Sequence, residues 1–304
     1  MNTRIIGTLL LLIGFTAGYG QKTKEYNIFS PSKNLQIRIE VGTDLRWSVE
    51  EGEEPVLLPS AIFMELENGM IWGKQMKAVK AITRTVNEKI AALHYKKDTV
   101  TDQYNSLLLR SKEGYAVEFR AYDEGAAYRF IAEGKDEIRI VNEQASFMFA
   151  GNFMGYFGYS NKPHLQDPFQ CSFENTYQHI PLDSFADTLA FCPVMVELPG
   201  GKKAVITEAD LEDYPGMFIS KIPGEHGLQG AFAHYPIKEK QGGHNNLQSY
   251  VLERANYMAA CSGSRSFPWR LVTVSSNDRS LLNNDMVYKL ASPNRLTDTW
   301  WIKP

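Results

Sequence analysis

Most of the chain alternates apolar and polar residues, which is the two-residue period of a β-strand with one buried face. The alternation predicts strands at residues 35–41, 45–49, 61–66, 91–95, 106–110, 115–122, 126–132 and 137–141. Turn residues at 42–44 and at Asp123-Glu124-Gly125 join neighbouring strands and predict hairpins. Pro55 and Pro59 predict a connection between two of the strands.

Helical patterning is nearly absent. The one candidate is Asn277–Asn283, where a capping residue precedes a short apolar pair. Many short strands with turn residues every eight to twelve positions are typical of a large β-sandwich. The sequence therefore predicts an all-β fold with two large sheets.

The first twenty residues form a separate segment. Arg4 provides a positive start, residues 5–15 are apolar but too short for a membrane span, and small residues follow at 17–20. This pattern predicts a signal peptide at 1–20, a folded region at 21–291 and an exported protein, periplasmic or extracellular. The net charge of −3 gives no footprint for nucleic acid. Nor does the pattern predict a membrane span once the signal has been removed.

An apolar run at Phe191–Val196 predicts a buried strand, and an acidic segment lies on each side of it. The first, Ser172–Tyr177, contains a carboxylate and a phenol three residues apart, and the second, Ile206–Met217, contains four carboxylates. Carboxylates and tyrosines at the rims of an apolar floor suit the binding of a hard cation or a sugar.

The second acidic segment also carries a family resemblance. Thr207-Glu208-Ala209-Asp210-Leu211 followed by Tyr214-Pro215-Gly216-Met217 resembles the N-terminal domain of glycoside hydrolase family 97, and residues 123–130, 263–270 and 301–304 agree with it in the same order. The resemblance implies a super-sandwich like that of aldose mutarotases, in front of a catalytic (β/α)₈ barrel. Family members are α-glucosidases and α-galactosidases that need calcium. The partners implied are an α-linked oligosaccharide, glucoside or galactoside, and a barrel in cis or on a separate chain.

The resemblance also assigns two site residues. Glu174 matches the place where the family's domain sends a glutamate toward a calcium ion shared with barrel glutamates, and Tyr177 accompanies it as a substrate-binding residue. Calcium takes six to eight oxygens, so Glu174 alone should bind it weakly. The family's catalytic carboxylates lie on the barrel, so no catalytic residue is assigned to this chain. Residues 292–304 are expected to be a linker, with Trp300 and Trp301 packing on a partner.

Other chemistry-bearing residues favour structural roles. The carboxylates at 208–213 are expected to be solvated or bonded to loop amides. Arg265 and Arg270 bracket a Pro-Trp segment that is expected to begin a strand buried against the neighbouring domain. The three cysteines, Cys171, Cys192 and Cys261, are expected to be small buried residues, and their spacing matches no zinc site.

Two other functions stay open. A free-standing lectin-like module would use the aromatic, glycine-rich stretch at 149–173, especially Phe153–Tyr159, whose alternative role is a loop packed by its own rings. A mutarotase-like isomerase would need a histidine acid and a carboxylate base in one cleft, for example His179 or His234 with Glu208. The stretch at 241–246 is expected to be a polar loop without a further role.

Overall fold

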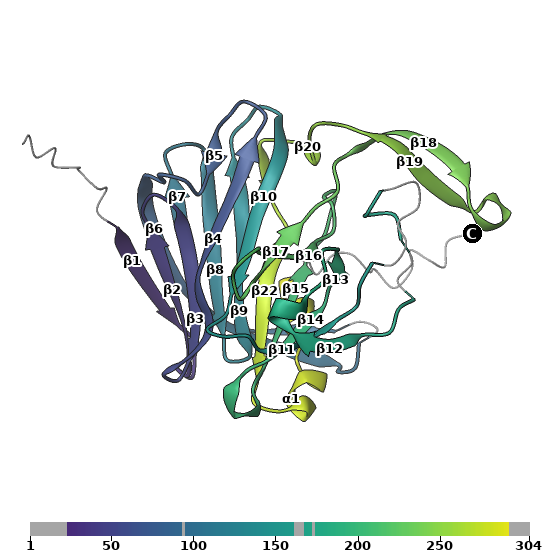
Figure 1. Cartoon of the computed structure of the whole chain (residues 1–304). Coiled ribbons are helices and arrows are strands. Elements are labelled where there is room, and N and C mark those ends of the chain that lie inside the picture. The colour runs from purple at the N-terminus through teal and green to yellow at the C-terminus, as the bar shows by residue number, and fades with distance from the viewer. Residues whose placement is uncertain (1–22, 93–94, 161–166, 172–173, 292–304) are drawn as a thin grey trace, which may run out of the picture.

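The protein is a two-sheet β-sandwich, described from a computed structural model of residues 23–92, 95–160, 167–171 and 174–291 (Figure 1). The predicted signal peptide and linker lie outside the described residues. No helix in the described ranges is long and apolar enough to cross a membrane. The strands of the two large sheets and of a separate hairpin are β1 Lys24–Phe29, β2 Leu35–Val41, β3 Leu45–Glu51, β4 Glu54–Leu66, β5 Ile71–Trp72, β6 Ala78–Ala91, β7 Thr99–Ser111, β8 Tyr115–Tyr122, β9 Gly125–Glu133, β10 Ile138–Met148, β11 Met154–Phe157, β12 Gln178–Pro181, β13 Ala190–Phe191, β14 Val194–Glu197, β15 Lys203–Ala209, β16 Phe218–Lys221, β17 Gly227–Ala231, β18 Pro236–Gly242, β19 Gln248–Arg254, β20 Ala259–Cys261, β21 Ser264–Ser266 and β22 Trp269–Ser275.

Each large sheet has ten strands, and the paired strands are antiparallel. The first follows the order β1-β2-β3-β4-β10-β17-β16-β13, with β5 on β4 and β20 on β10. The second follows the order β12-β11-β14-β15-β22-β9-β8-β7-β6, with β21 on β9. The all-β prediction is confirmed, because the alternating pattern gives each sheet one face that can be buried against the other.

The main core lies between the sheets. Trp47 on β3 is fully buried and packs edge-on against Tyr128 of β9 in the opposite sheet, with ring centroids 5.0 Å apart. A second apolar cluster lies on the outer face of the second sheet, where two short helices, α1 Asp278–Leu282 and α2 Met286–Leu290, follow the last strand. Met286 and Leu290 of α2 pack there with Trp269. The first helix was predicted, and the side chain of Asn277 caps it by accepting from the amide of Ser280 at 3.0 Å.

Local patterns placed several elements correctly. The predicted strand at 115–122 is β8, and Tyr122 pairs with Gly125 across the Asp-Glu-Gly turn. Gly125 has φ +151°, and a Cβ there would lie 2.4 Å from the carbonyl oxygen of Val272. The glycine is required by both the backbone conformation and the close approach of β22.

Three strand predictions were wrong in detail. The run Phe191–Val196 is two strands in different sheets, because the chain crosses from β13 to β14 at Cys192-Pro193. Pro55 and Pro59 lie inside β4 instead of in a connection. The ladder between β3 and β4 is irregular around Val49, which accommodates residues that cannot donate a backbone hydrogen bond. The strand predicted at 91–95 is instead the end of β6 at Ala91, and His94 lies outside the described residues.

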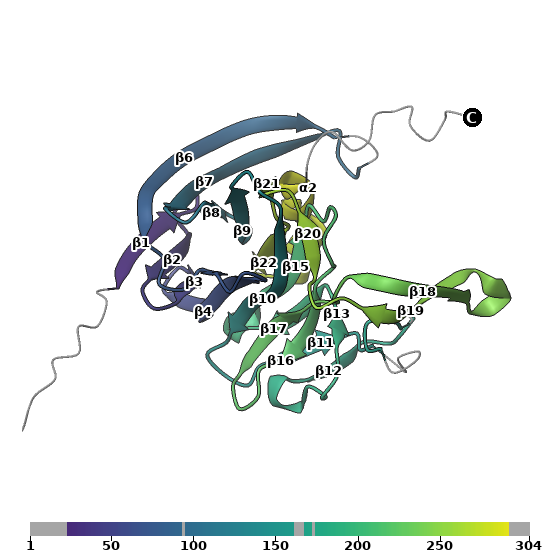
Figure 2. The same cartoon turned by 90° about the horizontal axis from the view of Figure 1, so that it is seen from above.

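Two stretches expected to be loops contain strands. Part of the aromatic stretch is β11, which pairs with β12 and β14 inside the second sheet. The polar stretch at 241–246 is the tip of the β18–β19 hairpin, which pairs with neither large sheet and reaches out from the body of the sandwich (Figures 1 and 2).

Candidate functional site

The segment 174–177 lies at the surface, directly before β12, the end strand of the second sheet. Glu174 is exposed and the side chain of Tyr177 is 54% exposed. The side-chain nitrogen Nδ2 of Asn175 donates to the carbonyl oxygen of Tyr159 at 2.5 Å, which anchors the segment between the two predicted site residues. The Tyr177 ring lies over Gly158, where an added Cβ would be 3.5 Å from two ring atoms. Both residues can therefore face a molecule outside this chain.

The described residues do not form a complete metal site. They contain no group of three or more histidines, cysteines, aspartates or glutamates placed to hold a metal ion. A single carboxylate offers two oxygens, whereas calcium takes about six to eight. The exposed Glu174 residue thus offers the oxygen chemistry of a single calcium ligand, and the described residues around it do not supply a full set.

The loop ahead of this segment is tied to the hairpin. Asp167 accepts from Arg254 of β19, with oxygen–nitrogen distances of 2.8 and 2.7 Å. Arg254 also donates to the carbonyl of His234 at 2.6 Å and lies over the ring of Phe169 at 5.8 Å. Phe169 in turn packs edge-on against Phe218 of β16. One arginine therefore joins the loop at 167–171, the base of the hairpin and the body of the sandwich.

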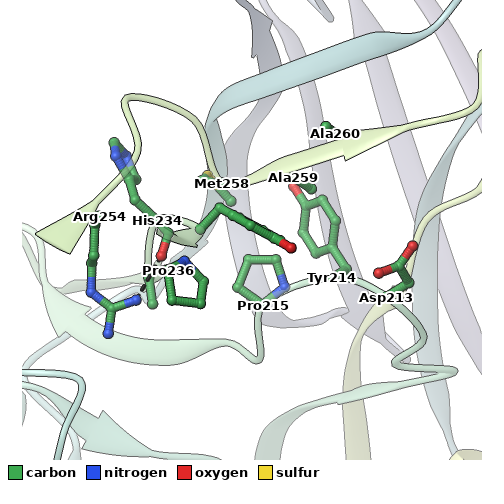
Figure 3. Close-up of a pocket in the computed structure, with 11 residues that line it drawn as sticks. Asp213, Tyr214, Pro215, His234, Pro236, Arg254, Met258, Ala259 and Ala260 are labelled. Carbon is green, nitrogen blue, oxygen red and sulfur yellow. Dashed lines mark hydrogen bonds between the residues drawn. The ribbon is translucent and has the colours of Figure 1, made fainter. Parts of the chain in front are cut away.

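A pocket of about 300 Å³ lies at the base of the hairpin (Figure 3). Tyr214 and Pro215, from the motif that carries the family resemblance, stand on one side of it. His234 and Pro236 stand on the other (Figure 3). The exposed lining is mostly apolar. Two of its polar side chains are already bonded, Arg254 to Asp167 and to the carbonyl of His234, and His234 to the carbonyl of Ala255.

A buried charge cluster lies beside Tyr214, with the guanidinium of Arg270 5.8 Å from the centroid of the tyrosine ring. Arg270 on β22 is 1% exposed and donates to both carboxylate oxygens of Glu143, at 2.7 and 2.9 Å. It also donates to Glu208 at 2.5 Å, and the other oxygen of Glu208 accepts from the amide of Met217 at 2.9 Å. The two carboxylates raise the pKa of Arg270 further above its ordinary value, although burial alone would lower it. Burial raises the pKa of Tyr214 well above its ordinary value.

Two carboxylates of this cluster, Glu208 and Glu143, have roles that the sequence predicted only in part. The prediction that the carboxylates bond to loop amides holds for Glu208, but its second oxygen pairs with Arg270, which leaves it unsuited to proton transfer. Glu143 was missed. Glu143 lies two residues before Ala145 and four before Phe147, which are both fully buried, so the two-residue period of β10 turns all three side chains toward the core. A carboxylate at a core-facing position was therefore the sequence signal that could have identified Glu143.

The Pro-Trp segment needs no neighbouring domain to bury it. Trp269 is fully buried within this chain, with the guanidinium groups of Arg120 and Arg129 over its ring at 4.5 and 4.3 Å. Arg265 donates to the backbone carbonyls of Glu212 and Asp213, at 2.7 and 3.2 Å. The expectation of burial against a separate domain was therefore wrong for Trp269.

The rings of the aromatic stretch pack mainly on residues from other parts of the chain. Phe157 and Tyr159 are buried, and both contact Phe185 edge-on, at 4.8 and 5.0 Å. Tyr156 is half-buried and stacks on His179 at 4.2 Å. The surface that a lectin would need is thus mostly occupied, and residues 161–166 of this stretch lie outside the described ranges.

The pairs required by a mutarotase are not brought together. His179 contacts Glu197 at 3.1 Å, and the pKa of Glu197 is lowered chiefly by its hydrogen bond from Lys203. His234 contacts the carbonyl of Ala255 at 2.9 Å. Neither histidine contacts Glu208. The three cysteines are all free, and Cys261 is buried as expected, whereas Cys171 and Cys192 are only partly buried.

Comparison with known proteins places this architecture in a family. A family model described as glycosyl-hydrolase 97 N-terminal matches residues 28–293. A retaining alpha-galactosidase of Bacteroides thetaiotaomicron is 36% identical over 301 residues, which are 98% of this chain and 46% of that protein. The chain therefore spans about half the length of the curated relative that it matches.

Solved structures agree on the fold. A glycoside hydrolase family 97 enzyme of Pseudoalteromonas sp. strain K8, in complex with acarbose, superposes with a TM-score of 0.71 at 21% identity, covering 92% of this chain and 40% of that one. A beta-arabinopyranosidase superposes with a TM-score of 0.67 at 18% identity, covering 84% of this chain and 40% of that one.

Proposed function

The chain belongs to the family of glycosyl-hydrolase 97 N-terminal domains, and from this premise we propose that it is the supporting domain of an exported α-galactosidase or α-glucosidase. In this function it packs beside a catalytic (β/α)₈ barrel, in cis or on a separate chain, and forms one wall of the sugar site. The observation that carries the proposal is the match itself, which takes in nearly all of this chain but less than half of the retaining alpha-galactosidase. The segment at 1–20 supports export to the periplasm or the extracellular space.

Glu174 and Tyr177 are the residues that we propose act toward the sugar site. The exposed carboxylate of Glu174 would complete a calcium site whose other ligands come from the barrel. An ion bound there would supply positive charge beside the sugar. Tyr177 would border the sugar with its exposed ring. The anchor from the Asn175 side chain to Tyr159 and the packing of Tyr177 on Gly158 support the proposal, because they fix the segment that carries the two exposed residues.

Glycoside hydrolysis needs an acid and a base or nucleophile, usually two carboxylates flanking the bond that breaks. Two carboxylates of this chain that lie close together already form ion pairs with the same arginine. Glu208 pairs with Arg270 and with the amide of Met217, and Glu143 is buried against the same arginine. We therefore assign the catalytic pair to the barrel, and the role of this chain is to position and enclose.

The test is a chimera that joins this chain to the portion of the Bacteroides alpha-galactosidase beyond its matched region. We expect the chimera to hydrolyse p-nitrophenyl α-galactoside in the presence of calcium. The present chain alone should hydrolyse neither the α-galactoside nor the α-glucoside. Hydrolysis by the chain alone would overturn the assignment of the catalytic pair.

The Glu174 ligand is tested in the same chimera by Glu174→Gln. Removing one charged ligand should raise the calcium concentration needed for half-maximal activity by at least about tenfold, with activity restored at saturating calcium. Glu225→Gln is the matched control, because Glu225 is also exposed and lies in the connection between β16 and β17. If the two variants depended on calcium equally, Glu174 would not be a calcium ligand.

A further inference from the structure

The outer face of the second sheet holds a cleft of about 280 Å³, which is lined by side chains from the four consecutive strands β6, β7, β8 and β9. Cross-strand pairing lays out its residues in rows. Arg84 is opposite Ser106, and Ser106 is opposite Arg120, so one row across three strands reads Arg-Ser-Arg. Neighbouring strands lie about 4.8 Å apart, which puts the two arginine backbones about 10 Å apart. The small serine between them leaves room for a group held by both guanidinium ions.

The rows on either side are apolar on β6 and β7, and the row through Leu108 continues across β8 and β9 as Glu118 and Arg129, which also line the cleft. Ile82 is opposite Leu108 in one, and Val86 is opposite Tyr104 in the other. All four side chains line the cleft together with Arg84 and Arg120. A ligand matching this layout has an apolar ring face and a single anionic group. Sugar rings with C–H faces and a carboxylate or sulfate substituent have this chemistry.

Arg120 is held in place before any ligand arrives. Its guanidinium lies over Tyr104 at 4.4 Å and over Trp269 at 4.5 Å. Its Nε donates to Glu118 at 2.9 Å, and the side chain is only 15% exposed. A donor fixed in this way loses little conformational freedom on binding, which favours affinity.

Arg84 supplies the uncompensated charge. Glu118 accepts from both Arg120 and Arg129, and Asp210 lies 3.9 Å from Arg129, so these two guanidinium ions are largely offset. The buried Asp102 also acts on Arg120 electrostatically. Arg84 is exposed and forms no ion pair within the described part of the chain.

From this layout we propose that the cleft binds an anionic monosaccharide unit, a uronic acid or a sulfated sugar, through Arg84 and Arg120. The volume is just below the roughly 300 Å³ at which pockets for drug-sized ligands begin, so it suits one ring more than a long chain. The cleft reaches β6, one end of the sheet order, whereas the segment with Glu174 and Tyr177 adjoins β12 at the other end. The proposal is thus independent of the proposed function.

The experiment is calorimetric titration of the purified chain with four probes. These are D-galacturonate, galactose 6-sulfate, galactose and inorganic sulfate. The two anionic sugars should bind at least about tenfold more tightly than either galactose or sulfate alone, because only they engage both the arginines and the apolar rows. A similar affinity for sulfate alone would show a plain anion site and overturn the proposal. Equal affinity for galactose, or no binding of any probe below about 10 mM, would also overturn it.

The variant Arg84→Gln should weaken binding of both anionic sugars at least about tenfold without changing the unfolding midpoint, since Arg84 is exposed. Arg46→Gln is the matched control: it removes the same charge from an exposed arginine on β3 of the other sheet, whose partner is Asp44. If both variants weaken binding equally, the effect comes from net charge and the cleft is not the site.

Discussion

Removal of the Arg270 side chain should destabilise the domain more than any surface ion-pair change. The guanidinium and its main partner Glu143 are 1% and 2% exposed, and three hydrogen bonds join the arginine to two carboxylates. Arg270→Met fills similar space but leaves Glu143 buried without a cation. Breaking a buried pair on one side costs about 3–5 kcal/mol. Glu208 is 14% exposed and keeps its bond to the amide of Met217, so it adds little.

Urea denaturation followed by tryptophan fluorescence measures this loss. A domain typically has a free energy of unfolding of about 5–15 kcal/mol, so Arg270→Met should lower the midpoint strongly. Adding Glu143→Met should recover most of the loss, because an apolar pair no longer needs a counter-charge. Arg139→Met is the control, since Arg139 pairs with Glu67 at the surface, where an ion pair contributes about 0–1 kcal/mol. The reasoning would be refuted if Arg270→Met were as stable as Arg139→Met. It would also be refuted if the double variant with Glu143→Met were no more stable than Arg270→Met alone.

Two further predictions concern the backbone and pH. Gly125→Ala should cost about 1–3 kcal/mol more than Gly114→Ala in urea denaturation: both glycines have positive φ, but only at 125 would the new Cβ lie 2.4 Å from a carbonyl oxygen. Equal losses of stability in the two variants would mean that backbone strain at positive φ determines the cost and that the contact with Val272 does not. Burial alone would raise the pKa of Asp285, but hydrogen bonds from Lys97 and from Tyr95 (2.7 Å) lower it below its usual value. The wild type should therefore be more stable than Asp285→Asn at neutral pH and lose that advantage from about pH 4 downwards in acid titration; a difference independent of pH would contradict this.

The elements predicted correctly are those specified by neighbouring residues. The strand β8 and the turn to Gly125 were located because alternation and a glycine are local signals. The division of Phe191–Val196 between two sheets was not predictable from its apolar pattern, because a buried strand has the same pattern in either sheet. The hairpin β18–β19 was missed for a related reason. It is exposed on both faces, so its sequence lacks the apolar–polar alternation of a half-buried strand.

The candidate site was predictable only in part. The exposure of Glu174 and Tyr177 agrees with a role toward a partner, but their assignment came from the resemblance, and their ligands stay predictions. The bond between Glu143 and Arg270 joins residues 127 positions apart, and alternation alone does not say which charged groups meet across a sandwich. The Arg-Ser-Arg row was hidden for the same reason, since it depends on the register of three strands.

The loop after β15 connects the buried charge cluster to the outer cleft and to the pocket at the base of the hairpin. Glu208 ends the strand on Arg270, and Met217 at the far end of the loop donates back to the same carboxylate. Between them, Asp210 lies 3.9 Å from Arg129 beside the outer cleft, and Tyr214 lines the pocket at the hairpin. The Glu208 carboxylate thus ties the far end of the loop to β15 and to the buried arginine, while Arg265 holds the middle of the loop through the carbonyls of Glu212 and Asp213. Loss of the buried arginine should therefore loosen the pocket and the outer cleft together, whereas Arg84→Gln should affect the outer cleft alone.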